Sequence, residues 1–144
     1  MAMEKVQALD LNSSFPRSPR ETMAGLVHLP RMVDKARAAQ SGNLGEYIYP
    51  CPLDQKILDF LKVKPDCFTQ LTVKKEDGQI SDWAAERTRD RTQRERDQVN
   101  SQILDSKPDA SKMSYFTGLR DSIDPTRTDV TTWTDLIDLE EGRL

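Results

Sequence analysis

The sequence predicts an all-α fold, a compact single-domain bundle of about six or seven helices. Apolar residues recur three or four positions apart in several segments, as in the stripe formed by Leu53, Ile57 and Leu61. Proline or a capping residue opens most of these segments, and glycine closes one of them. No segment alternates apolar and polar residues between hairpin turns, so we expect no sheet.

The chain has 144 residues, about the length of one domain. We expect residues 1–14 to form a loose N-terminal arm and residues 15–144 to form a single helical domain. Leu9 and Leu11 are the apolar residues that could hold the arm against the body of the protein.

A first helix start is expected at Ser18. Ser18 is a good N-cap residue, Pro19 suits the first helical position, and Glu21 can complete a capping box. We expect this helix to be short, because Gly25 and then Pro30 interrupt the pattern.

Two better-defined helices follow. The first begins at Pro30, continues to about Ser41 and ends at Gly42, which suits the left-handed conformation after a helix. A connector then leads to Pro52, which opens the next helix and places Cys51 at its N-cap.

The middle of the chain predicts two more helices. One begins at Pro65 and ends near a turn at Asp77–Gly78, and the next is capped by Ser81. Its continuation over residues 86–98 contains no apolar residue, which indicates a solvent-facing helix held by charge pairs. Alternatively, the side of this helix that carries Thr88 lines a polar cavity.

The last third predicts two amphipathic helices. One follows Ser111 and carries an apolar stripe that ends at Ile123. The other begins with a capping box of Thr132 and Asp135, and Trp133 is expected to anchor it to the core.

Composition excludes several classes of protein. The chain carries 21 basic and 24 acidic residues, a net charge of −3, whereas nucleic-acid-binding domains usually carry a basic excess. No apolar run reaches the roughly 18 residues of a membrane helix, and the first residues do not resemble a signal peptide. We therefore expect no nucleic-acid partner, no membrane association and a cytoplasmic location, with Cys51 and Cys67 as free thiols.

Three long blocks of the chain resemble a known family. They are SSFPRSPRETMAGLVHLPRMVDKARA, LGEYIYPCPLDQKILDFLKV and RTDVTTWTDLIDLEEGR. With the residues between them, from about Leu11 to Leu144, they are similar to the bacterial family known as domain of unknown function 5069. The resemblance implies a bacterial, soluble, helical protein. It implies no activity and supplies no functional residues.

Basic residues gather in the first third of the chain, next to several helix starts. Arginine binds carboxylate or phosphate with two parallel hydrogen bonds, and helix N-termini add partial positive charge. We therefore expect a small anionic metabolite to bind a cluster of Arg17, Arg20, Arg31, Lys35 and Tyr47. The alternative is a set of surface salt bridges, which would contribute little free energy.

Candidate catalytic residues occur in the same part of the chain. They are His28, Asp34, Cys51 and Asp54. His28 could act as a base near neutral pH, and a thiol at a helix N-cap could have a lowered pKa, although Asp54 would oppose that change. The alternative is that His28 and Cys51 only pack or cap. The cysteine spacing matches no familiar metal motif, so we expect no metal site.

Three functional hypotheses remain open at this point. The first is a cytoplasmic domain that binds a small anionic metabolite or an acidic peptide segment through the basic cluster. The second is an enzyme that uses His28, Asp34 or Cys51 in the same pocket, with no cofactor indicated. The third is a protein-interaction module, such as a homodimer formed through Trp133 and the acidic segment 135–144.

Overall fold

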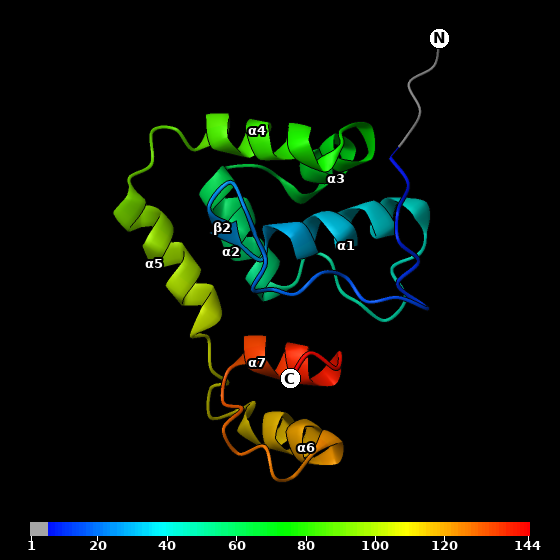
Figure 1. Ribbon diagram of the computed structural model, residues 1–144, viewed down its shortest axis with the longest axis vertical. Coiled ribbons are helices and arrows are strands. Elements are labelled where there is room, and N and C mark those ends of the chain that lie inside the picture. Colours follow the sequence, from blue (N-terminus) through cyan, green and yellow to red (C-terminus); the bar gives the residue numbers. More distant parts are fainter. Residues whose placement is uncertain (1–5) are drawn as a thin grey trace.

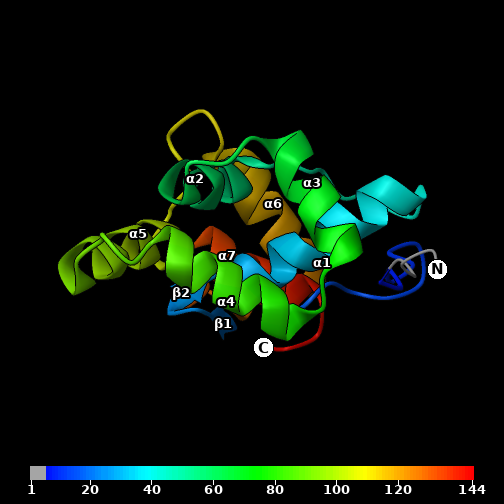
Figure 2. The same ribbon diagram turned by 90° about the horizontal axis from the view of Figure 1, so that it is seen from above.

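A helix that is buried on all sides lies at the centre of the fold. In the computed structural model, which describes residues 6–144, this helix is α1 (Leu29–Ser41), and every residue from Leu29 to Ala38 is buried. In Figure 1, α3 (Pro65–Lys74) and α4 (Asp77–Arg87) lie on one side of α1, and α7 (Trp133–Glu140) lies on the opposite side with α6 (Met113–Ile123) beyond it. Figure 2, the view from above, shows α3 and α4 crossing over α1.

Six further helices complete the described part of the chain, so the predicted mostly helical fold is confirmed. They are α2 (Pro52–Leu61), α3 (Pro65–Lys74), α4 (Asp77–Arg87), α5 (Gln93–Leu104), α6 (Met113–Ile123) and α7 (Trp133–Glu140). Within residues 6–144, no helix is both long enough and apolar enough to cross a membrane.

Two apolar clusters hold these helices together. The larger cluster contains residues of all five helices from α1 through α5, and Met32, Ile57 and Phe68 are fully buried in it. The smaller cluster joins α6 to α7 around Phe116, and the ring of Trp133 meets Phe116 edge-on with 5.1 Å between centroids. Trp133 therefore anchors α7 by packing against α6.

A short β-hairpin replaces the first predicted helix, so the expectation of no sheet was wrong. Strands β1 (Thr22–Met23) and β2 (Leu26–Val27) pair antiparallel. The two turn residues, Ala24 and Gly25, have φ values of 53° and 75°, and a tight hairpin of this kind needs positive φ at both positions.

The capping signals that suggested a helix at Ser18 are used in another way. The Ser18 N–H donates to the Glu21 carboxylate at 3.2 Å, as a capping box predicts, but no helix follows. The Ser18 hydroxyl instead donates to Asp138 at 2.9 Å, and the Glu21 carbonyl accepts from the His28 N–H at 3.2 Å. Tertiary contacts have therefore overridden the local preference for a helix.

The helix boundaries in the middle of the chain also differ from the prediction. Asp77 lies in the first turn of α4, whose N-cap Glu76 donates its N–H to the Gln79 side chain at 3.0 Å, and the Asp77 carboxylate accepts from Arg37 at 2.9 Å. The polar segment 86–98 is not one helix: α4 ends at Arg87 and α5 begins after Thr92, whose side chain accepts from the Glu95 N–H.

The end of the predicted N-terminal arm contacts the connector after α1. Residues 1–5 of that arm lie outside the described residues. Leu11 is buried, and its N–H donates to the Asn43 carbonyl at 2.9 Å. Gly45 lies against this point with a φ of 63°, and a Cβ atom there would be 3.0 Å from the Leu11 carbonyl oxygen.

We predict opposite effects of alanine at two glycines. Gly45→Ala should lower the free energy of unfolding by about 1 kcal/mol or more, because the position combines positive φ with a backbone clash. Gly118→Ala should raise it by up to about 1 kcal/mol, because Gly118 is inside α6 with nothing within 4 Å of the added Cβ. Chemical denaturation measures both, and a Gly45→Ala variant as stable as Gly118→Ala would contradict the backbone described here.

Candidate functional site

A cavity of about 830 Å³ opens beside the first turns of α1. Its walls come from residues 11–15, from α1, from the connector at residues 46–48, and from the end of α7. These segments are far apart in the sequence, and α1 brings them together because it is buried among them.

Three of the five predicted ligand-binding residues share this cavity. Arg31, Lys35 and Tyr47 line it, whereas Arg17 and Arg20 do not. Arg17 instead binds the carboxylates of Asp34 and Asp77, and Arg20 binds those of Asp135 and Asp138. Asp34, a predicted catalytic candidate, is also outside the lining and accepts three hydrogen bonds from Arg17.

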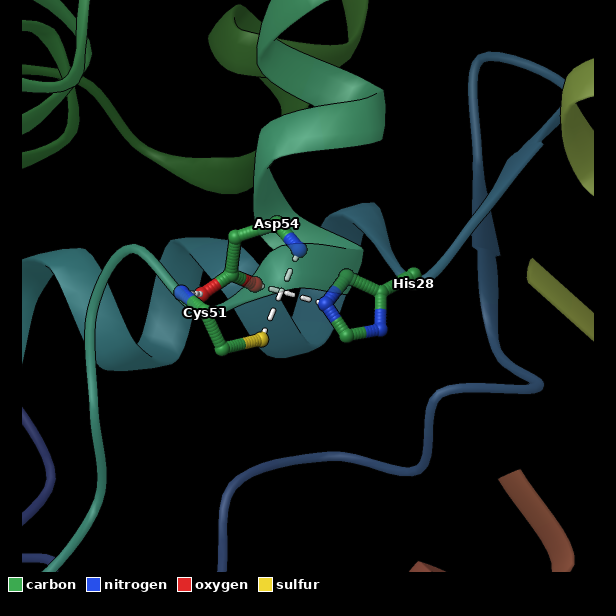
Figure 3. Close-up of side chains that lie close together, drawn as sticks. All are labelled: His28, Cys51 and Asp54. Atoms are coloured by element: carbon green, nitrogen blue, oxygen red, sulfur yellow. Dashed lines mark hydrogen bonds and ion pairs between the residues drawn. The ribbon is translucent and has the colours of Figure 1, made fainter. Parts of the chain in front are cut away.

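The other three catalytic candidates meet at the start of α2 (Figure 3). The Asp54 carboxylate accepts from His28 Nε2 at 2.6 Å and from the Cys51 N–H at 2.9 Å, and it forms an ion pair with Lys35 Nζ at 2.7 Å. Asp54 reaches this position because it is the third residue of a helix opened by Pro52, with Cys51 as the N-cap. His28 and Cys51 line the cavity, and Asp54 lies behind them with no exposed surface.

Asp54 is a carboxylate at neutral pH. Burial alone would raise its pKa, but the hydrogen bond from His28 and the charge of Lys35 lower it to about 2. Burial lowers the pKa of His28 and outweighs the opposing effect of Asp54. The pair is therefore a neutral imidazole hydrogen-bonded to a carboxylate.

This pairing determines which nitrogen of His28 carries the proton. A carboxylate only accepts hydrogen bonds, so we assign the proton to Nε2, and Nδ1 is left as an acceptor. Nδ1 is buried and has no hydrogen-bond partner within residues 6–144. Figure 3 shows it on the edge of the ring that faces away from Asp54.

His28 is also held in an uncommon backbone conformation. It links β2 to α1 with φ 72° and ψ −21°, which costs free energy for a residue that has a Cβ atom. Its side chain is 0% exposed. Strained backbone of this kind is concentrated at functional sites, so the conformation of His28 is a second feature that favours a functional role for this residue.

Cys51 is at the N-cap predicted from Pro52, but its chemistry differs from the expectation. Burial raises the pKa of the thiol, and the nearby Asp54 carboxylate raises it further, whereas Lys35 lowers it less. The N-cap position alone would have lowered it. Cys51 is therefore a protonated thiol at neutral pH.

Lys35 occupies the place where a cation would sit in this cluster. Its Nζ lies 2.7 Å from Asp54 Oδ2, 3.0 Å from the Ile48 carbonyl and 3.3 Å from Cys51 Sγ. His28, Cys51 and Asp54 each offer a ligand atom within 4.8 Å of the others. A metal ion bound there would have to displace the ammonium group, and the absence of a metal site stays a prediction.

Arg31, one turn before Lys35 on α1, is also paired within the protein. Its guanidinium donates to both oxygens of Glu141 at 2.9 and 2.8 Å, and the Tyr47 hydroxyl donates to the same carboxylate at 3.0 Å. Burial and the charge of Glu141 raise the pKa of Tyr47 to about 12. The sequence analysis missed Glu141, because nothing in its local pattern connects it to a residue 110 positions away.

The comparisons with known proteins agree with the resemblance noted in the sequence. A family model described as "Domain of unknown function (DUF5069)" matches residues 13–143. No curated protein matches the chain. The family description assigns no activity, so the function has to be argued from the geometry of the site.

We predict strong coupling between Lys35 and Asp54. Asp54→Asn should lower the free energy of unfolding by about 3–5 kcal/mol, because it leaves a buried ammonium group without a counter-charge. Adding Lys35→Met should recover part of that loss. Asp59→Asn, on the exposed face of α2, is the control and should change stability by less than about 0.5 kcal/mol. Additive effects of the two buried substitutions in denaturant titrations would contradict the pairing.

We also predict a pH dependence that comes from His28. The pKa of His28 is lower in the folded than in the unfolded chain. The contribution of neutral His28 to the stability of the fold is therefore complete above pH 6.5 and is lost as the pH falls below that value. The free energy of unfolding should then fall by up to about 1.4 kcal/mol per pH unit.

The matched variant for this measurement is His28→Asn, since asparagine tolerates the left-handed conformation and does not titrate in this range. Its stability should change less between pH 6.5 and about pH 5. Equal slopes for the two proteins would show that His28 is not buried as a neutral imidazole.

Proposed function

The chain belongs to the family of the domain of unknown function 5069, and from its site we propose that it is an enzyme that acts on a small polar molecule with His28 as the general base. The cavity would hold the molecule, Nδ1 of His28 would take a proton from it, and Asp54 would orient the imidazole. The bacterial origin that the resemblance implies and the cytoplasmic location expected from the sequence are part of this proposal.

The observation that carries the proposal is the unpartnered Nδ1 of His28. A buried acceptor without a donor costs about 1–3 kcal/mol, and buried polar groups are almost always satisfied. His28 lines the cavity, so a hydroxyl or amine of a bound molecule can supply the missing donor. The Asp54 hydrogen bond at 2.6 Å fixes the tautomer that leaves this nitrogen basic.

The surrounding charges suit a base that gains a proton only briefly. Asp54 stabilises the imidazolium that forms, because it remains a carboxylate. Lys35 and Arg31 oppose that charge and contribute to the lowered pKa of His28. Burial is the largest cause of the lowered pKa, and together with these two charges it keeps the imidazole unprotonated and ready to accept a proton at neutral pH.

An anionic ligand in the same cavity is the second candidate. It is favoured by the position of Arg31, Lys35 and Tyr47, which all line the cavity. Each cation already has a carboxylate partner, however, at 2.8 Å for Arg31 and 2.7 Å for Lys35. An anion would have to share or displace these partners, so this candidate ranks below the first.

The homodimer hypothesis stays a prediction. The residues that suggested it have contacts within the chain: Trp133 packs on Phe116, and Glu141 binds Arg31. The side chains of Met113 and Tyr115 remain exposed on α6. Sedimentation at several concentrations distinguishes a dimer from a monomer.

Diethyl pyrocarbonate, which acylates unprotonated imidazole, tests the proposal because His28 is the only histidine in the chain. We expect the native protein to react at Nδ1. The rate should stay nearly constant as the pH falls through 6.5, since the pKa of His28 is lowered. Reaction only after unfolding, or a rate that halves near pH 6.5, would contradict an accessible base.

The catalytic part of the proposal is tested by turnover. Small hydroxyl- and amine-bearing compounds that shift the single imidazole Cε1–H resonance are followed for conversion by NMR. His28→Asn should slow conversion by about 100-fold or more, whereas Asp59→Asn should not. Equal conversion by His28→Asn would remove His28 from the mechanism.

A further inference from the structure

The two cations of the cavity are neutralised within the protein. Both oxygens of Glu141 accept from Arg31, and Asp54 lies 2.7 Å from the ammonium group of Lys35. Both pairs are buried, and the residues that form them are all less than 9% exposed. A ligand that enters the cavity therefore meets little uncompensated positive charge from these side chains.

Two further carboxylates line the cavity without such partners. Glu46 and Glu140 form no salt bridge within residues 6–144, and both are exposed to solvent. Partial burial raises the pKa of Glu140 most, and the neighbouring Glu141 raises it further, against a smaller opposing effect of Arg31. The lining thus favours positive charge in a ligand.

Large apolar side chains surround the same opening. Phe15, Ile48 and Tyr115 line the cavity and are 55%, 69% and 64% exposed. Exposed apolar groups gathered at one opening indicate that the bound molecule has an apolar part. The rings of Phe15 and Tyr115 can also attract a cation to their faces.

We propose that the cavity binds a protonated amine carried on a short apolar stem. The ammonium group would lie among Glu46, Glu140 and Nδ1 of His28, and the stem would lie against Phe15, Ile48 and Tyr115. This inference rests on the proposed function and adds the chemical class of its substrate. The proton that His28 accepts is then one of the ammonium protons, which leaves a neutral amine in the cavity and an imidazolium paired with Asp54.

Three probes of matched shape test the ligand class: phenethylamine, 2-phenylethanol and phenylacetate. They share an aromatic stem and differ in charge. Calorimetric titration at neutral pH and the Cε1–H resonance of His28 report affinity and location. We expect phenethylamine to shift that resonance and to bind about ten-fold more tightly than 2-phenylethanol, and phenylacetate to bind most weakly.

Variants that remove a negative charge test which carboxylates cause the preference for a positively charged ligand. The double variant Glu46→Gln/Glu140→Gln keeps the shape of both side chains and should reduce the preference for phenethylamine over 2-phenylethanol by about ten-fold. Glu86→Gln, on the exposed face of α4 and outside the cavity lining, should leave it unchanged. An unchanged preference in the double variant overturns the assignment of these carboxylates.

Tighter binding of phenylacetate, or no binding of any of the three probes, overturns the amine class. Acylation of His28 by diethyl pyrocarbonate separates this failure from a failure of the proposed function. If His28 still reacts in the native protein, the general base stands and only the substrate class is wrong. If His28 is unreactive and no probe binds, both proposals fall together.

Discussion

The fold depends on the burial of a helix that carries four charged side chains. A charge taken out of water is tolerated only with a counter-charge or several hydrogen bonds nearby. Each charged residue of α1 therefore binds a partner from another part of the chain. The pairs are Arg31–Glu141, Asp34–Arg17, Lys35–Asp54 and Arg37–Asp77. They tie α7, the N-terminal segment, α2 and α4 to α1 in one arrangement.

The same requirement shapes the chemistry of the cavity. Lys35 binds Asp54 and so fixes the carboxylate that holds His28, and Arg31 binds the end of α7 that forms one wall. The positive charges are used to build the site. The groups of the cavity lining that are left without a partner within residues 6–144 include Nδ1 of His28 and the carboxylates of Glu46 and Glu140, beside an apolar rim. The basic residues in the first third of the chain are thus used mainly in ion pairs within the protein, which their composition alone does not indicate.

Local patterns predicted the helices well and the long-range pairs poorly. Pro52 correctly placed the start of α2, and with it Cys51 and Asp54, because these signals act within one turn. The hairpin was missed because Ala24 carries no signal for positive φ. Glu141 could not be assigned to Arg31 from sequence, since only the packing of α7 against α1 brings them together. The sequence pointed to several residues that line the cavity, but the charge balance of the cavity required the structure.

The central claim is that burial holds His28 neutral, with a proton on Nε2 toward Asp54 and an Nδ1 that has no partner within residues 6–144. The most direct test is ¹⁵N NMR of the imidazole as a function of pH, which gives a single spin system because the chain has one histidine. We predict a protonated Nε2, an unprotonated Nδ1 and a pKa below 6.5 in the folded protein. A proton on Nδ1 at neutral pH, or a pKa at or above 6.5, would contradict this arrangement.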